Sequence, residues 1–419
     1  MILRSRVLLP LLITAIFLTG CSEETISDKA VKVASKLGAR EFKRAAENTD
    51  IDTTILLNSW HNILVAFGDF EAIEAVSETD NNIVELTIRF AYTRAQICFR
   101  FTHKQKLYAI SAGRTLPEPL PGDVDITVIA ENGYPLPGSL NIPAPNAPCV
   151  IFVHGSGPNN RDELVGSNRP FRQLAAGLHE RGVATLRHDK RSSWFRFEAP
   201  TLHADTIADA VAAFKLAQAT PGIDPERIYI LGHSQGGIAM PLIAEAIDNA
   251  AAGYVIMAGA TVKPIEDIII DQKRHLFQRY HEDDETLEML LGEDNRLADA
   301  VKKKRAFPDA PVAYNAIFLY NVNFFSSMPA EPAQEAASKI RRPLLVLQGG
   351  RDYQVTPEYF QEYRKIVEPT NPEASFKLYP ALNHIFIPGE GESHPEEYFN
   401  AADIPSEVID DIADFILAH

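Results

Sequence analysis

Residues 228–243 read IYILGHSQGGIAMPLI, and this stretch decides the fold. Its first four residues are apolar, which is typical of a strand buried on both faces of a sheet. A turn of small residues follows with Ser234 at its centre, and the residues from Ile238 onward can begin a helix. The stretch therefore predicts a buried strand, a sharp turn that presents a serine, and a helix.

Ser234 lies in the pattern Gly-x-Ser-x-Gly, with Gly232 and Gly236 two positions to either side. In such a strand-to-helix turn the serine backbone is strained and its hydroxyl projects from the end of the sheet. The first amides of the following helix point to where negative charge develops on an acyl carbonyl. We therefore expect Ser234 to be a nucleophile and the backbone N–H of Gln235 to be one donor to the oxyanion.

A serine nucleophile needs a base and an acid that orients the base, and in a fold of this kind they follow in the order serine, acid, histidine. The mainly apolar run 344–348 leads through two glycines and an arginine to Asp352. Such sites lie where parallel strands end, so we predict that Asp352 is the acid. The alternatives are that Asp352 only caps a turn, or that Asp309, which follows no strand, takes the role.

The base is expected after the last strand of the sheet. Residues 376–379 form a strand-like run, and His384 follows it after a short loop. His394 lies ten residues further on in a polar loop and is the competing histidine. We predict that His384 is the base, because its position after a strand end matches that of Asp352.

The second oxyanion donor is expected in the loop that follows the apolar run 150–153. This loop reads HGSGP at 154–158, and its glycines let the backbone approach a ligand closely. We assign the backbone N–H of Ser156 as the donor, with His154 as a residue that braces the loop. No cluster of cysteine and histidine has metal-ligand spacing, and we expect neither a metal nor a cofactor.

On both sides of this stretch, apolar runs alternate with helical segments, which predicts an α/β fold with a mainly parallel sheet. The predicted strands are 124–130, 150–153, 183–186, 228–231, 254–258, 343–348 and 376–379, and the predicted helices are 171–181, 204–220 and 408–417. From about 262 to 339 the alternation gives way to a helical pattern, which we interpret as a cap over the site. The basic cluster Lys302–Arg305 in this segment is expected to be a solvated face; the alternative is a docking patch for an anionic substrate.

Five segments together resemble a family of bacterial α/β-hydrolase carboxylesterases. They are HGSGPNNRDE at 154–163, LRHDKR at 186–191, GHSQGG at 232–237, LQGGRD at 347–352 and LNH at 382–384. The resemblance covers residues 123–419 and implies hydrolysis of small-molecule esters, with Ser234, Asp352 and His384 in the triad positions. His188 stands where the family usually has a tyrosine, a difference that can alter the wall of the pocket or its response to pH.

Two other functions remain open at this point. The first is a peptidase or amidase of the same fold, whose acidic anchors for a substrate amine would lie in the cap. The second is a lipoprotein in which the hydrolase domain only binds a ligand. The presence of all three triad residues argues against the second function. Against the first, the sequence shows no propeller repeat of the kind by which some of these peptidases exclude large substrates.

A chain of 419 residues is longer than one ordinary domain. We expect residues 29–114 to form a separate small α+β domain. Helical periodicity at 30–37 and 55–67 precedes three or four strands with alternating apolar residues. This order resembles the cystatin-like domain that precedes some bacterial hydrolases. Residues 115–122 contain three prolines and predict a semi-stiff linker.

The first 20 residues predict a signal peptide, with a short basic start and an apolar run of about twelve residues. The run ends in LTGC, which resembles a bacterial lipobox with Cys21 as the lipidated residue. We therefore expect a protein of the cell envelope that a lipid on Cys21 anchors to a membrane, the outer membrane if the source is Gram-negative. The alternative is an ordinary signal peptide with a chance cysteine.

The charge balance argues against one class of partner. The chain has 56 acidic and 40 basic residues, a formal net charge of -16, and such a surface repels the phosphates of nucleic acids. Apart from Cys21, the cysteines are Cys98 and Cys149, each in an apolar run. We expect both to be buried free thiols in strands.

Overall fold

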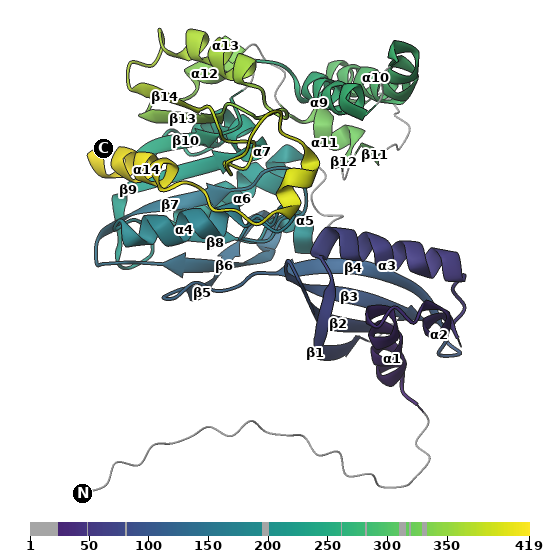
Figure 1. The fold of residues 1–419 in the computed structure, drawn as a ribbon. Helices are drawn as coiled ribbons and strands as arrows, with labels where there is room; N and C mark the ends of the chain where they lie inside the picture. The colour runs from purple at the N-terminus through teal and green to yellow at the C-terminus, as the bar shows by residue number, and fades with distance from the viewer. Residues whose placement is uncertain are drawn as a thin grey trace, which may run out of the picture.

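The computed structural model describes residues 24–47, 49–79, 82–194, 201–260, 262–280, 283–309, 316–317, 320–328 and 333–419. The predicted signal peptide and Cys21 lie outside these residues. A small N-terminal part and a larger C-terminal part are visible in Figure 1. Within the described ranges, no helix combines the length and the apolar character needed to cross a membrane.

The small part is an antiparallel four-stranded sheet with helices packed on it. Its elements are α1 (Ile26–Gly38), α2 (Phe42–Ala46), α3 (Thr53–Phe67), β1 (Phe70–Thr79), β2 (Ile83–Phe90), β3 (Arg94–Phe101) and β4 (Leu107–Leu116), with the strands in the order β1-β2-β3-β4. Every second residue of β2 and β3 is buried, and these side chains pack with Trp60 of α3. The α+β architecture agrees with the prediction, although β4 extends two residues into the predicted linker 115–122.

The larger part is built on an eight-stranded sheet. Its strands are β5 (Val124–Ile129), β6 (Pro135–Asn141), β7 (Ala147–Val153), β8 (Ala184–His188), β9 (Ile223–His233), β10 (Gly253–Met257), β13 (Leu344–Gly349) and β14 (Ala374–Tyr379). The order is β14-β13-β10-β9-β7-β8-β6-β5, and the strands from β14 to β8 are parallel. β6 runs antiparallel to both of its neighbours. This sheet confirms the predicted α/β-hydrolase fold.

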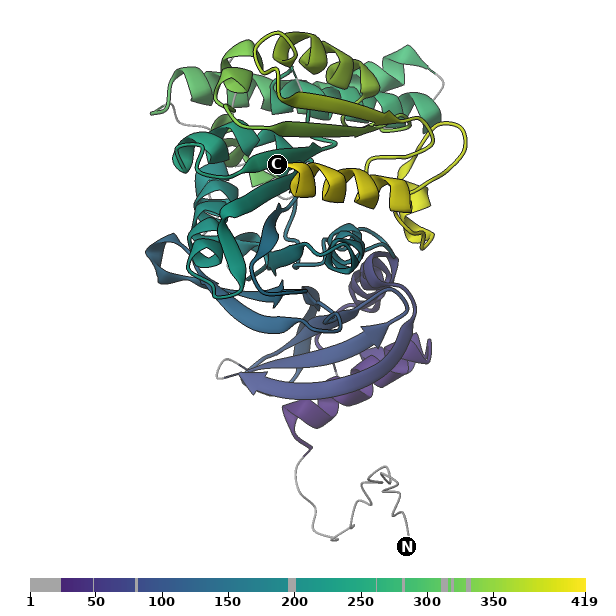
Figure 2. The ribbon, with the colours of Figure 1, turned by 90° about the vertical axis from the view of Figure 1, so that its left-hand side faces the viewer.

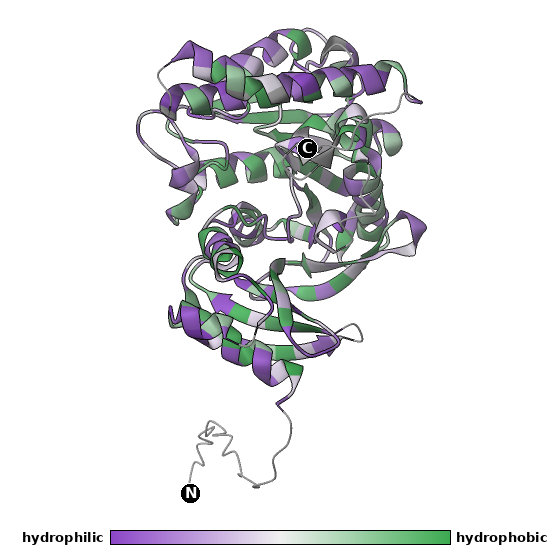
Figure 3. Ribbon diagram, turned by 90° about the vertical axis from the view of Figure 1, so that its right-hand side faces the viewer, coloured by the Kyte–Doolittle hydropathy of each residue, from purple (hydrophilic) through white to green (hydrophobic). Residues whose placement is uncertain are grey.

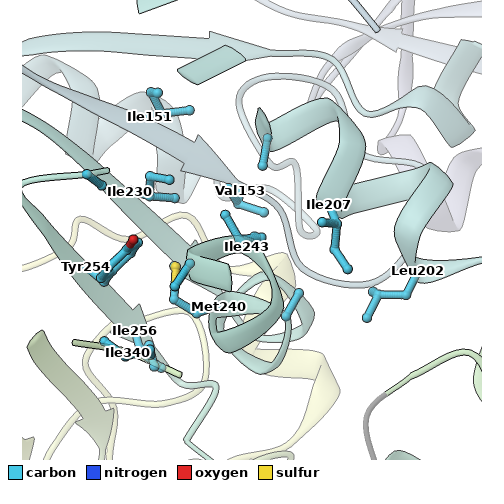
Figure 4. Close-up of a cluster of buried hydrophobic side chains, with 14 of the residues drawn as sticks. Ile151, Val153, Leu202, Ile207, Ile230, Met240, Ile243, Tyr254, Ile256 and Ile340 are labelled. Carbon is cyan, nitrogen blue, oxygen red and sulfur yellow. The ribbon is translucent and has the colours of Figure 1, made fainter. Parts of the chain in front are cut away.

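Helices cover both faces of this sheet. α4 (Pro170–Glu180) and α14 (Ser406–Ala418) lie on one face, and α6 (Ala208–Gln218), α8 (Met240–Ala246) and α13 (Pro357–Val367) lie on the other. Ile230 of β9 packs in the same core as Met240 and Ile243 (Figure 4), whereas Leu231 enters the opposite core. Figure 3 shows the central strands of the large sheet mainly in green, the colour of hydrophobic residues. Burial on both faces accounts for their apolar sequences.

The segment after β10 forms the predicted helical cap. It contains α9 (Ile265–Tyr280), α10 (Asp284–Ala306), β11 (Ala316–Ile317), β12 (Tyr320–Asn321), α11 (Val322–Ser326) and α12 (Ala333–Ser338). The basic cluster does not form one solvated face, because Arg305 Nη1 pairs with buried Glu266 at 2.6 Å. Half-exposed Lys302 pairs with Asp267 at 2.8 Å. These ion pairs join α10 to α9, so at least part of the cluster serves the packing of the cap.

The small part lies at the β5–β6 edge of the large sheet, far from the β14 edge (Figures 1 and 2). Asn160 Nδ2 donates to Thr115 Oγ1 at 2.9 Å, and the Arg114 guanidinium lies 3.6 Å from the centre of the Trp194 ring system. Asn160 belongs to the loop after β7. The small part therefore contacts one of the loops at the end of the sheet.

Cys98 and Cys149 are free and lie in β3 and β7, as predicted. Cys149 is fully buried, and burial raises the pKa of its thiol to about 12. Cys98 is only partly buried. A thiol with so high a pKa is unreactive, so Cys149 serves packing.

Candidate active site

Ser234 connects β9 to the short helix α7 (Gln235–Ile238) in a strained conformation. Its φ is 51° and its ψ is -116°, a region that residues other than glycine rarely adopt. A Cβ at Gly232 would lie 2.5 Å from the Gly236 carbonyl group, and one at Gly236 would lie 2.3 Å from the Val153 carbonyl oxygen. Both glycines are therefore needed for the turn, which accounts for the pattern around Ser234.

Asp352 and His384 meet beside the ends of β13 and β14. The distance from His384 Nδ1 to Asp352 Oδ2 is 2.8 Å, and both side chains are buried. Asp352 Oδ1 accepts hydrogen bonds from the amides of Gln354 and Val355, and Oδ2 accepts one from Gln348 Nε2. A carboxylate with these donors accepts from Nδ1–H of His384, which leaves Nε2 of the imidazole as the acceptor.

One cavity of about 540 Å³ brings the predicted site residues together. Ser234, His384, Ser156 and Gln235 all line it, while Asp352 lies behind His384. The Ser156 hydroxyl donates to Gln235 Oε1 at 3.1 Å, so the two segments predicted to supply oxyanion donors are adjacent. The cavity can thus hold an acyl group against a serine, an imidazole and two backbone segments.

The two competing residues lie elsewhere. Asp309 is exposed after the end of α10, and His394 pairs with Glu396 at 2.6 Å in a surface loop. Neither belongs to the described residues that line the cavity. The structure therefore favours Asp352 and His384 over both of them.

The cap supplies much of the cavity wall. Apolar side chains line it from α7, α9, α11 and the loops: Val165, Ile238, Ile265, Ile268, Ile269, Phe325, Val355 and Ile385. Gln272 of α9 donates through Nε2 to the carbonyl oxygen of Gln354 at 2.9 Å, which ties the cap to the loop that carries Asp352. The predicted position of the cap over the site is therefore correct.

Residues 150–402 match the model of the Alpha/beta hydrolase family. The chain belongs to the alpha/beta hydrolase family. Esterase EstD of Thermotoga maritima is similar to this hydrolase, with 31% identity over 380 residues that cover 85% of this chain and 86% of that protein. The matched share exceeds what residues 123–419 alone make up, so the similarity extends into the small N-terminal part.

Two solved structures are similar to this chain. Est1E from Butyrivibrio proteoclasticus has 17% identity and a TM-score of 0.46, and the match covers 70% of this hydrolase and 99% of that chain. Esterase Pf2001 of Pyrococcus furiosus has 17% identity and a TM-score of 0.47, with 73% and 96% covered.

The loop after β7 of this hydrolase is held by buried polar groups. His154 Nε2 lies 3.1 Å from the carbonyl oxygen of Asn160, which confirms His154 as a brace. Lys190 Nζ donates to the carbonyl oxygen of Gly155 at 2.8 Å and pairs with Asp205 at 2.9 Å. The loop conformation therefore depends on charges that have been removed from water.

His188 differs from expectation. Its side chain is buried, its Nδ1 lies 3.1 Å from the carbonyl oxygen of Asp189, and its ring contacts that of His154. It is not one of the described residues on the cavity wall. Of the two effects considered for His188, the one on the pocket wall is wrong, because the side chain packs beneath the loop; the one on the response to pH stays a prediction.

Two further side chains at the site were not predicted. Glu163 and His233 are buried beside Ser234, and both line the cavity. Glu163 belongs to the HGSGPNNRDE segment and His233 to the GHSQGG segment, but the sequence alone gives neither of them a role. Spacing does not reveal a contact between residues 70 positions apart.

Within the described part of the chain, no group of three or more histidine, cysteine, aspartate or glutamate side chains is placed to hold a metal ion.

Proposed function

We propose that this hydrolase cleaves carboxylic esters through an acyl-enzyme formed on Ser234. The observation that carries the proposal is the buried hydrogen bond between Asp352 and His384, with that imidazole lining the same cavity as Ser234. A nucleophile, a base and an acid that orients the base are the parts that acyl transfer requires. The esterase activity named for EstD agrees with this assignment.

In the proposed mechanism, Nε2 of His384 takes the proton of the Ser234 hydroxyl while the serine oxygen attacks the acyl carbonyl. The oxyanion accepts hydrogen bonds from the amides of Gln235 and Ser156. His384 then protonates the departing alcohol, and water repeats the sequence to release the acid. Asp352 keeps the proton on Nδ1 and stabilises the imidazolium ion.

The charges around the cavity favour an ester over a substrate with a free amine. A peptidase of this fold would need acidic anchors for the amine. Glu163 is the single acidic side chain among the described residues on the wall, and it already contacts Gly155 and His233. A neutral acyl ester fits an apolar wall without an unpaired charge.

A comparison of matched substrates tests the proposal. The purified protein should hydrolyse p-nitrophenyl butyrate, whereas the matching p-nitroanilide and an aminoacyl p-nitroanilide should be turned over much more slowly. Faster turnover of the aminoacyl anilide would support the peptidase. Absence of turnover with all three would support the ligand-binding lipoprotein.

We further propose that a lipid on Cys21 anchors the protein to a membrane of the cell envelope, and that residues 29–114 form a cystatin-like domain. The basic, apolar and small residues before Cys21 support the anchor. The mass of the N-terminal peptide of the mature protein tests it: a diacylglyceryl group on Cys21 is expected, and an unmodified cysteine or cleavage elsewhere would contradict it.

A further inference from the structure

A second acid–imidazole pair lies beside Ser234 on the cavity wall and has no part in the mechanism above. Glu163 follows β7 by a loop, and His233 is the last residue of β9, directly before Ser234. The side chains of Glu163 and His233 are 1% and 6% exposed, and Glu163 Oε1 lies 3.1 Å from His233 Nδ1. Burying two ionisable groups costs free energy, which their mutual attraction and further hydrogen bonds have to offset. A pair kept at this cost beside a reactive serine is a candidate for a functional role.

The pair contacts the loop after β7 and the loop of His384, and His233 directly precedes Ser234. The amide of Gly155 donates to Glu163 Oε1 at 2.6 Å, and Gly155 precedes the proposed oxyanion donor Ser156. On the other side, His233 Nε2 lies 3.0 Å from the carbonyl oxygen of His384. The Glu163–His233 pair therefore connects the oxyanion loop, the nucleophile turn and the loop of the base.

The partners determine the protonation of His233. A carbonyl oxygen only accepts, so Nε2 must carry a proton, and the Glu163 oxygen that accepts from Gly155 also accepts from Nδ1. Burial lowers the pKa of His233, but the charge and hydrogen bond of Glu163 and the His384 carbonyl oxygen outweigh burial and raise it overall. The raised pKa favours the imidazolium form, in which both ring nitrogens of His233 donate, one to Glu163 and one to the carbonyl oxygen of His384.

The peptide between Gly155 and Ser156 is also held from its other side. Lys190 Nζ donates to the Gly155 carbonyl oxygen at 2.8 Å. In a trans peptide the C=O and the following N–H point in opposite directions, so this bond also fixes the direction of the Ser156 N–H. Glu163 accepts from the N–H of Gly155, and Lys190 donates to the C=O of Gly155. The two side chains therefore fix the peptide groups before and after Gly155.

We propose that Glu163 and His233 form a positioning pair, which holds the Ser156 amide and the His384 imidazole in register with Ser234. The inference rests on the proposed acyl-transfer function. Neither side chain exchanges a proton with the substrate; the pair acts through the groups it holds. Its loss should therefore lower kcat more than it raises KM, because the apolar wall of the cavity is unchanged.

The variant Glu163→Gln tests the pair with almost no change in shape. The amide can still accept from Gly155, but it no longer supplies the charge that raises the pKa of His233. We expect kcat for p-nitrophenyl butyrate to fall by up to about 100-fold with KM nearly unchanged, which is the scale of a small misplacement of reacting groups.

The pH profile separates positioning from a general loss of structure. A raised pKa means that the imidazolium contacts are present at low pH and are lost as pH rises through that pKa, so His233 should limit activity on the alkaline side. The charged and titratable groups around it are Glu163, Asp352, His384 and His154. In Glu163→Gln the carboxylate no longer opposes the effect of burial, so the pKa of His233 should fall. The alkaline limb of the kcat profile should then move to lower pH.

The matched control is Glu131→Gln, because Glu131 faces His203 at 3.3 Å in a pair whose side chains are 61% and 63% exposed. This variant should keep the wild-type kcat and pH profile. A double-mutant cycle with His233→Gln adds a second readout: for a pair that acts as a unit, the double variant loses little more than the worse single variant. If Glu163→Gln does not fold, His233→Gln tests the proposal by itself. Its kcat should fall with KM nearly unchanged, and its alkaline limb should differ from that of the wild-type protein.

Wild-type kcat and an unmoved alkaline limb in Glu163→Gln and His233→Gln would overturn the inference, as would fully additive losses in the cycle. That result differs from failure of the proposed function, in which the wild-type protein itself would not hydrolyse the ester or Ser234→Ala would remain active.

Discussion

Replacement of Ser234 with alanine is expected to lower kcat for p-nitrophenyl butyrate by on the order of 10⁶-fold, the loss seen when the nucleophile of a serine triad is removed. The strained backbone at Ser234 presents the hydroxyl to the cavity, and alanine has no atom that can attack the carbonyl. Alanine can occupy the same turn, so the fold should persist. Steady-state kinetics of the purified variant measures the loss.

The control for this prediction is Ser338→Ala, since Ser338 is an exposed serine of α12 whose hydroxyl donates only to the carbonyl oxygen of Glu335 among the described residues. Its kcat should equal that of the wild-type protein. Ester hydrolysis by Ser234→Ala at a substantial fraction of the wild-type rate would remove Ser234 from the mechanism.

Replacement of Asp352 with asparagine should lower kcat by about 10⁴-fold, because a histidine in the wrong tautomer cannot accept the serine proton. The amides of Gln354 and Val355 both donate to Oδ1, so the carbonyl oxygen of an asparagine must face them. Its NH₂ group then faces His384 Nδ1, which has to become the acceptor. The proton then lies on Nε2, the nitrogen that has to accept the proton of the Ser234 hydroxyl.

The matched control is Asp309→Asn, which changes an exposed carboxylate outside the described cavity wall and should leave kcat unchanged. For Asp352→Asn, KM for the ester should change little, because Asp352 lies behind His384. Full activity in Asp352→Asn combined with a large loss in Asp309→Asn would show that Asp309 of the cap, and not Asp352, orients the base.

The elements that position the site could be predicted because their sequences are locally distinctive. β7, β10, the first four residues of β13 and residues 228–231 of β9 are buried and read as continuous, mainly apolar runs. β6 was not predicted, because its sequence PLPGSLN contains two prolines and a glycine, which are unusual inside a sheet. The sequence left open whether the small domain has three strands or four, because most residues of β1 are exposed and show no alternation.

The residues of the proposed triad could be selected from the sequence because each one follows a strand end in the required order. The supporting contacts could not be, since they join residues that only the fold brings together. Glu163 and His233 are 70 positions apart, and His233 contacts the backbone of a residue 151 positions further on. Arg305 and His188 were misjudged for the same reason: packing decides which way a side chain turns.

The most direct measurement of the central claim is labelling of the purified protein with a fluorophosphonate, followed by mass spectrometry of its peptides. A serine activated by the adjacent imidazole should carry a single phosphonyl group on Ser234, and Asp352→Asn should label far more slowly. An unlabelled wild-type protein, or an adduct on another residue with Ser234 unmodified, would contradict the account.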